Sequence, residues 1–195
     1  MRKIVLPMMM TLDGFVAGPN GEMDWLPPFD DGALWEDLHE EMWTKLRSVD
    51  TLLLGRVTYQ IWETFWPATG SNPRSTKSDI EFSRFADRTQ KVVFSKTLDK
   101  VEWKNTKLVR GDIAEEVSRL KEPPGKDLAL AGGAGIAQTF MKLGLIDEYL
   151  ITVHPVILGK GKLLFRNPGD RQKLRLVGTK RFRSGAVGLR YEPVR

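Results

Sequence analysis

Residues 128–140 read LALAGGAGIAQTF, an apolar run that enters a cluster of glycine and alanine and leaves it in a helix-like pattern. Glycine loses more conformational freedom on folding than any other residue, so Gly132, Gly133 and Gly135 at one strand-to-helix turn indicate a specific requirement. Either the turn is tight and its backbone crowded, or a ligand must approach bare amides. A phosphate is the ligand that suits such a turn, because a helix N-terminus offers unpaired N–H groups and partial positive charge.

This glycine turn matches neither of two common phosphate motifs. Counting GxGxxG from Gly133, the third glycine position is Gln138, so the dinucleotide fingerprint is incomplete. No GK[ST] follows the turn, so it is not a Walker A loop. The tight-turn and phosphate interpretations therefore both stay open at this point.

Outward from the glycine turn, apolar segments alternate with helical patterns and predict an α/β fold with a mostly parallel sheet. Buried strands are predicted at 3–10, 51–55, 91–94, 107–111 and 127–131. Helices are predicted at 33–47, at 57–65, after Asp112, which could cap its helix, and after the glycine turn, where Gly144 can end the helix. Loops are predicted at 17–32 and 66–79.

The last quarter of the chain has a different pattern. Segments 148–158, 162–165, 173–182 and 185–194 resemble strands joined by short turns, so we expect them to be antiparallel. No repeat or linker divides the chain. We therefore expect one α/β domain over residues 1–195, with a twisted, mostly parallel sheet flanked by helices and antiparallel C-terminal strands.

Composition excludes several classes of site. The chain has no cysteine, which excludes disulfides and thiolate chemistry, and only His39 and His154 are present, which excludes a histidine-rich metal site. We expect no bound metal. The N-terminal MRKIVLPMMM is too short for a signal peptide, and no run approaches the ~20 apolar residues of a membrane span, so we expect a cytoplasmic protein without a membrane partner.

Positive charge is concentrated near the C-terminus. Residues 160–195 hold 11 Lys/Arg and 2 Asp/Glu, a balance of +9 in a chain whose net charge is +5. The basic residues alternate with apolar ones, as on the solvated face of a strand. A nucleic-acid surface is the alternative, but no nucleic-acid-binding motif is present, so we expect no such partner.

Two further strand ends carry residues suited to anions. LLLGRVTYQIW (52–62) ends its strand at Gly55 and Arg56, and Thr58 opens a helix that its hydroxyl could cap; VVFSKTL (92–98) ends in Ser95 and Lys96. Each alone could be an ordinary cap or loop. Ligands of open α/β sheets bind outside the carboxyl ends of the strands, so the coincidence of three such ends favours a dinucleotide with a third phosphate, which describes NADPH.

The segments TLDGFVAG (11–18), LLLGRVTYQIW, VVFSKTL and 130–165 resemble the dihydrofolate-reductase-like superfamily. They are most similar to the reductase domain of the riboflavin-biosynthesis deaminase-reductase, in its stand-alone form. The most specific piece is GLIDEYLITVHPVILGKGKLLF (144–165). The resemblance covers about residues 3–192. It implies a dihydrofolate-reductase-like fold, NADPH as the cofactor and assembly as a homodimer.

The resemblance also implies a role for each matched position. Met10 and Asp13 would lie by the nicotinamide, with Gly159 in a turn close to the cofactor. The phosphates of NADPH would be contacted by Gly55, Arg56 and Thr58. The adenosine 2′-phosphate would lie at Ser95 and Lys96. The pyrophosphate would be held by Ala131, Gly132, Gly133, Ala134, Gly135 and Ile136.

Substrate-facing positions depart from the riboflavin reductases. Ala131 replaces their typical glutamate before the paired glycines, and Phe15 replaces a lysine after the LDG turn. Asp13 is one candidate catalytic residue, with an ordinary turn aspartate as the alternative. Asp31, beside Asp30 at the start of the first helix, is the other, with helix capping as the alternative.

Aromatic residues provide candidates for an aromatic substrate slot. Its walls could be formed by Trp25, Trp35, Tyr59 and Trp62, although aromatics at helical spacing are more often core. We expect an NADPH-dependent reductase similar to 5-amino-6-(5-phosphoribosylamino)uracil reductase, acting on a small heterocyclic substrate. The alternatives are a dihydrofolate-reductase-like activity and a non-catalytic NADPH-binding sensor.

Overall fold

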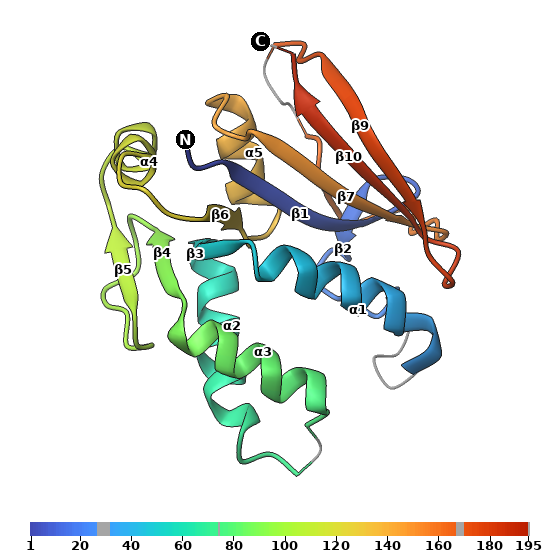
Figure 1. Cartoon of the computed structure of the whole chain (residues 1–195), viewed down its shortest axis with the longest axis horizontal. Helices are drawn as coiled ribbons and strands as arrows, with labels where there is room; N and C mark the ends of the chain where they lie inside the picture. Colours follow the sequence, from blue (N-terminus) through green and yellow to red (C-terminus); the bar gives the residue numbers. More distant parts are fainter. Residues whose placement is uncertain (27–31, 74, 167–169, 195) are drawn as a thin grey trace.

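The computed structural model describes residues 1–26, 32–73, 75–166 and 170–194, and for residues 32–37 and 39 it describes only the backbone. Its strands are β1 (Ile4–Thr11), β2 (Phe15–Ala17), β3 (Val49–Gly55), β4 (Gln90–Phe94), β5 (Thr106–Val109), β6 (Asp127–Leu130), β7 (Glu148–His154), β8 (Lys162–Leu163), β9 (Leu174–Arg181) and β10 (Val187–Pro193). Its helices are α1 (Gly32–Leu46), α2 (Arg56–Thr69), α3 (Lys77–Arg88), α4 (Ile113–Lys121) and α5 (Ala134–Lys142). The main sheet has the order β5-β4-β3-β6-β1-β7-β10-β9, and β2 pairs with β8 separately (Figure 1).

The main sheet is parallel from β5 through β7. β10 is antiparallel to both of its neighbours, β7 and β9. The predicted fold class is therefore confirmed. The strand expected at 148–158 ends earlier, at His154. It is antiparallel to β10 as predicted, and it also runs parallel to β1, because α5 carries the chain back along the sheet before β7 begins.

Both faces of the parallel strands are covered, which explains why Leu52, Leu53 and Leu54 of β3 form a continuous apolar run rather than an alternating one. Leu53 packs in a core cluster with Phe140 of α5 on one face. Leu52 and Leu54 pack in a second cluster with Phe85 of α3 on the other. The three leucines are completely buried. The sheet is thereby held as a rigid platform whose strand ends keep fixed positions.

Helical structure extends into the predicted loop at 66–79. α2 runs to Thr69 and accommodates Pro67 in its last turn. α3 begins at Lys77, where Thr76 and Asp79 form a reciprocal capping box that satisfies two free N–H groups. Phe82 and Phe85 of α3 then pack against the sheet.

A small two-stranded sheet lies at the end of β1. β2 begins just before the predicted loop at 17–32, and β8 is the part of the predicted strand 162–165 that pairs with it. Gly161, with φ +152°, sits where a β-carbon would overlap the carbonyl oxygen of Ala17. Only glycine fits this crossing, so the turn before β8 is tightly held against β2.

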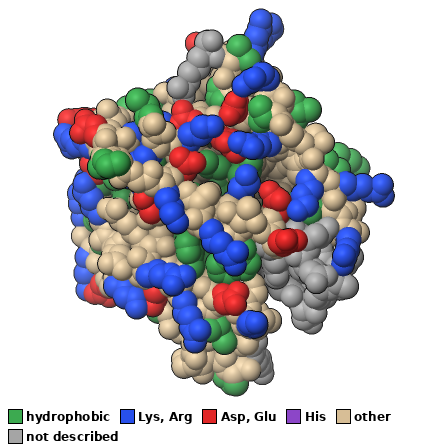
Figure 2. All heavy atoms as spheres, in the orientation of Figure 1, with side chains coloured by type: hydrophobic (Ala, Val, Ile, Leu, Met, Phe, Trp, Pro, Cys, Tyr) green, Lys and Arg blue, Asp and Glu red, His purple; other side chains and the backbone are tan. Residues whose placement is uncertain are grey.

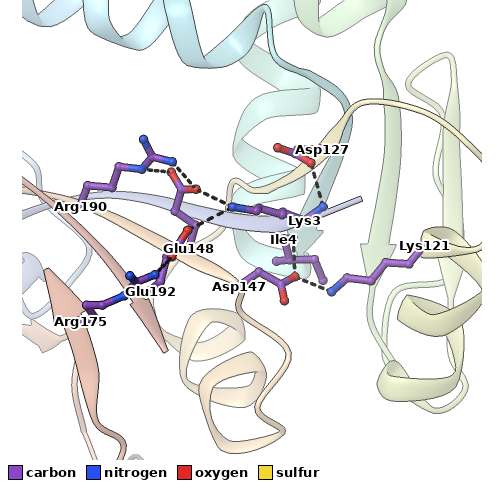
Figure 3. Close-up of polar contacts among 9 residues, drawn as sticks. All are labelled: Lys3, Ile4, Lys121, Asp127, Asp147, Glu148, Arg175, Arg190 and Glu192. Carbon is purple, nitrogen blue, oxygen red and sulfur yellow. Dashed lines mark hydrogen bonds and ion pairs between the residues drawn. The ribbon is translucent and has the colours of Figure 1, made fainter. Parts of the chain in front are cut away.

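Charged residues at the amino ends of the strands are mutually paired (Figure 3). Glu148, whose side chain is 6% exposed, accepts from Arg190 of β10 with Nε–Oε1 at 2.7 Å and Nη2–Oε2 at 3.0 Å. Lys3 binds Glu192 with Nζ–Oε1 at 3.1 Å. Arg2, buried nearby, pairs with the Asp50 carboxylate.

Basic residues of the C-terminal strands are also paired in several places. Arg175 binds Glu192 at 2.8 Å and Lys180 binds Glu41 at 3.1 Å. On the face seen in Figure 2, Lys and Arg side chains are dispersed with Asp and Glu among them rather than gathered in one patch. This arrangement agrees with the interpretation of alternating basic residues as a solvated strand face. Within the described chain, no helix has the length and apolar character that crossing a membrane requires.

Candidate functional site

A cavity of about 290 Å³ lies at the carboxyl ends of β3, β4 and β5. The first turns of α5 and α4 close its sides. It is lined by Gly55, Arg56, Phe94, Ser95, Lys96, Val109, Arg110, Gly111, Ile113, Gly135, Ile136 and Thr139. Two of the predicted anion-suited strand ends and the glycine turn thus meet at one rim of the sheet, as the parallel topology requires.

Two helices begin side by side at this rim. Gly55 and Gly133 are the N-cap residues of α2 and α5, and neither helix start has a side-chain cap. The sequence suggested that the hydroxyl of Thr58 caps α2, but it does not. It accepts a hydrogen bond from the Gly133 amide at 3.0 Å instead. This bond joins the two helix starts, whose remaining N–H groups create positive potential suited to an anion.

The glycines of the turn have different structural roles. A β-carbon at Gly132 would overlap Cγ2 of Ile136 and lie 3.5 Å from the amide nitrogen of Gly55. A β-carbon at Gly135, which lines the cavity, would meet nothing within 4 Å. Overlap with the Ile136 side chain of the same turn therefore explains Gly132. Gly135 has no such internal requirement, which leaves close approach of a ligand as its interpretation.

Three cations surround the cavity. Arg56 donates to Gln60 at 3.0 Å on the exposed start of α2, and Lys96 is exposed after β4. Arg110, which sequence reasoning missed, donates to the backbone oxygen of Asp99 at 2.7 Å. Its signal was present in KLVRG (107–111), a fourth strand that ends in a cation. No described acidic residue lines the cavity, so these charges are not neutralised there.

Further along the same rim, the turn after β1 meets the loop after β7. The Asp13 carboxylate accepts from the Thr11 hydroxyl at 2.6 Å and from the amides of Leu158 at 3.1 Å and Gly159 at 2.7 Å. The hydrogen bond from Thr11, followed by those from the two amides, lowers the pKa of Asp13. Asp13 is therefore ionised at neutral pH and is poorly suited to donate a proton. Gly159 contacts Asp13 and does not line the cavity.

The predicted aromatic substrate slot is contradicted at Tyr59. Its side chain is completely buried, and its hydroxyl contacts Glu63 and accepts from the amides of Glu102 at 3.0 Å and Trp103 at 3.2 Å. Burial raises the pKa of Tyr59 to about 12. Tyr59 is thus a core residue that ties α2 to the segment before β5.

The other predicted substrate and catalytic residues have mixed outcomes. Trp25 is buried with Leu26, Leu38, Phe182 and Ala186 and meets His154 edge-on at 5.5 Å, so its ring belongs to the core. Met10 is partly buried on β1 against the main core. Asp30, Asp31 and the side chain of Trp35 lie outside the described residues. Among the described residues, no cluster of His, Cys, Asp or Glu could hold a metal ion.

Comparison with known proteins assigns the chain to a family. The model of the RibD C-terminal domain matches residues 2–187, which is almost the whole chain. The chain belongs to the RibD C-terminal domain family. Two uncharacterized proteins of Bacillus subtilis (strain 168) are relatives: YyaP is 37% identical over 97% of this chain and 94% of its own, and YwjB is 34% identical over 97% of each.

Solved structures with this fold include other RibD-type proteins. A putative riboflavin biosynthesis protein from Shewanella sp. PV-4 has a TM-score of 0.72 at 23% identity, with all of both chains covered. The deaminase/reductase of Thermotoga maritima has a TM-score of 0.65 at 17% identity over 99% of this chain and 57% of its own. Dihydrofolate reductase from Enterococcus faecalis, complexed with NADP(H), has a TM-score of 0.60 at 14% identity over 99% and 97%. At these identities the likeness shows a dihydrofolate-reductase-like fold.

Proposed function

We propose that this RibD C-terminal domain protein is an NADPH-dependent reductase of a small, heterocyclic substrate. The observation that carries the proposal is the cavity at the strand ends, where Arg56, Lys96 and Arg110 surround a space that none of the described acidic residues lines. A dinucleotide with a third phosphate supplies the negative charge that such a site lacks.

The residues present fit NADPH along the rim. Phe94, Val109 and Ile113 offer apolar surface for the adenine. Ser95, Lys96 and Arg110 would hold the 2′-phosphate, and Arg56 with the amides at Gly133 to Gly135 would hold the pyrophosphate. The nicotinamide half would extend toward Met10 and Asp13 at the ends of β1 and β7. When bound, NADPH supplies the hydride; the chain's residues bind and orient it and shield it from water.

We expect the substrate to differ from that of the riboflavin enzymes. Ala131 and Phe15 stand where those enzymes carry a glutamate and a lysine, so we propose a ring system related to 5-amino-6-(5-phosphoribosylamino)uracil rather than that compound itself. Homodimer formation and Asp31 as the proton source stay as proposals. The hydrogen bonds that already occupy the Asp13 carboxylate favour one alternative, a sensor that binds NADPH without turnover.

Titration of the purified chain with NADPH and with NADH tests the cofactor proposal. Wild type should bind NADPH more tightly, and Lys96→Ala or Arg110→Ala should weaken NADPH about tenfold while leaving NADH nearly unchanged, because only NADPH carries the 2′-phosphate. Lys142→Ala, an exposed lysine at the other end of α5, is the matched control. Equal losses for both cofactors would remove the 2′-phosphate assignment.

NADPH oxidation with a panel of cyclic imines and carbonyls, including dihydrofolate and 5-amino-6-(5-phosphoribosylamino)uracil, separates the reductase from the sensor. Turnover of any ring supports the reductase. Tight NADPH binding with no turnover across the panel would support the sensor instead.

A further inference from the structure

Both carboxylate oxygens of Asp13 accept hydrogen bonds from other groups of the protein. Oδ1 receives the Thr11 hydroxyl at 2.6 Å and the Leu158 amide at 3.1 Å; Oδ2 receives the amides of Leu158 at 3.1 Å and Gly159 at 2.7 Å. Charge-assisted hydrogen bonds to backbone amides are among the strongest that a protein makes. Asp13 is therefore a clamp between two chain segments that lie 145 residues apart.

The clamped segment is the loop from Pro155 to Gly161, which follows β7 at the carboxyl rim of the sheet. Backbone bonds reinforce its position, since the Leu12 amide donates to the Val156 oxygen at 2.8 Å. Gly159 has a φ of +78°, a conformation that its contact with Asp13 helps to hold. Two large apolar side chains are exposed on the joined turns, Leu12 at 63% and Ile157 at 75%.

The far end of this loop is tied to the glycine turn's helix. The side-chain amide of Gln138 in α5 donates to the Leu163 oxygen at 2.8 Å, and the Leu164 amide donates to the Gly14 oxygen at 3.0 Å. The residues that follow the loop therefore connect it to the turn after β1 and to α5, whose first turn lines the cavity.

We infer that Asp13 is a positioning residue that holds the 155–161 loop, with the apolar pair Leu12 and Ile157, as the wall against which the nicotinamide half of the cofactor binds. The inference rests on the proposed function and assigns Asp13 a role other than proton donor. An apolar wall suits a planar ring because burying it removes apolar surface from water. The clamp keeps that wall in place before the ligand arrives, which lowers the ordering cost of binding.

Binding of two probes to Asp13→Asn tests this assignment. NADPH spans the rim, whereas 2′,5′-ADP carries only the half that the cavity would take. The amide NH₂ of asparagine cannot accept from a backbone N–H, so the variant loses at least one clamp bond. We expect about tenfold weaker NADPH binding and unchanged 2′,5′-ADP binding. Hydrogen exchange at the amides of Leu158 and Gly159 should become faster.

Asp170→Asn, an exposed loop aspartate, is the matched control and should change neither probe. A thermal unfolding midpoint close to that of wild type shows that the variant is folded; if it does not fold, Asp13→Glu, which displaces the carboxylate by one methylene, gives the same comparison. If wild type binds NADPH and the variant weakens both probes equally, or leaves NADPH unaffected, the positioning role is wrong while the proposed function survives. If wild type binds neither probe, both proposals are overturned.

Discussion

Charged residues have opposite arrangements at the amino ends and at the carboxyl ends of the parallel strands. At the amino ends of the parallel strands, Glu148 is nearly buried and is paired with Arg190 (Figure 3). Arg2 is also nearly buried and is bound by the Asp50 carboxylate and two backbone oxygens. At the carboxyl ends, Lys96 and Arg110 surround a cavity without a described acidic residue. Satisfied charges contribute to the fold, whereas unneutralised charges around a cavity are available to a ligand.

This difference teaches how to separate structural from functional charge in one small domain. A substitution at the amino edge should change the free energy of unfolding and leave cofactor affinity alone. A substitution at the carboxyl rim should do the reverse. Measuring both quantities on each variant tests the comparison directly.

Arg2→Met should have the largest effect. The Arg2 side chain is 8% exposed and donates to the oxygens of Lys126 at 2.6 Å and Leu120 at 2.9 Å besides pairing with Asp50. Methionine keeps much of the apolar stem but leaves the two backbone oxygens and the Asp50 carboxylate without their donor. We therefore expect the free energy of unfolding, measured in urea, to fall by about 3 kcal/mol, with NADPH affinity unchanged. Lys96→Met is the control at the rim; a tenfold loss of NADPH affinity in Arg2→Met would break the comparison.

Lys91, at the start of β4, should show a pH-dependent effect of about 2 kcal/mol. It is completely buried, and its ammonium donates to the oxygens of Ala86 at 2.6 Å and Thr89 at 2.9 Å. Burial lowers the pKa of Lys91 to about 8 from its ordinary 10.5. Between these values the unfolded chain binds more protons than the folded one, so the free energy of unfolding should rise as pH rises from 8 to 10.

Urea unfolding at pH 7, 8, 9 and 10 measures this contribution of Lys91. In Lys91→Met the rise should disappear, because the titrating group is gone. A rise of equal size in the variant would show that other groups cause it. The NADPH affinity of Lys91→Met should equal that of wild type at each of these pH values.

Gly132 and Gly135 provide the smallest and sharpest contrast. Gly132→Ala should destabilise the fold by about 1 kcal/mol, because its new methyl group overlaps Ile136. Gly135→Ala meets nothing within 4 Å, so thermal unfolding should show unchanged or slightly raised stability, while NADPH titration shows weaker binding. Unchanged NADPH affinity in Gly135→Ala would mean that no ligand approaches this glycine.

The sequence predicted the parallel strands well because their apolar runs are buried on both faces and end in recognisable turns. It missed α3, because Pro67 and the small polar residues after it suggest a loop, although the Thr76–Asp79 capping box and the spacing of Phe82 and Phe85 were present. It also missed β2, which spans three residues, too few for a period to appear.

The candidate site was predictable only in part. The rule that parallel strands end at one edge brought Arg56, Lys96 and the glycine turn together, and the same rule would have found Arg110. The rule cannot tell which way a helical side chain points, so Tyr59 was assigned to a substrate slot although it faces the core. Contacts between distant segments, such as Asp13 with Leu158 and Gly159, leave no local pattern in the sequence.

The ion pair between Lys3 and Glu192 joins the first and last strands of the main sheet through their common neighbour β7. Because β1 begins and β10 ends near this ion pair, the described chain ends lie at the amino ends of the parallel strands, whereas the cavity lies at their carboxyl ends. Figure 1 marks where the two ends lie in the fold. A tag, surface tether or second module attached to either end would therefore stand clear of the proposed cofactor entrance, and a short peptide joining the ends would permit circular permutation with the cleft left open.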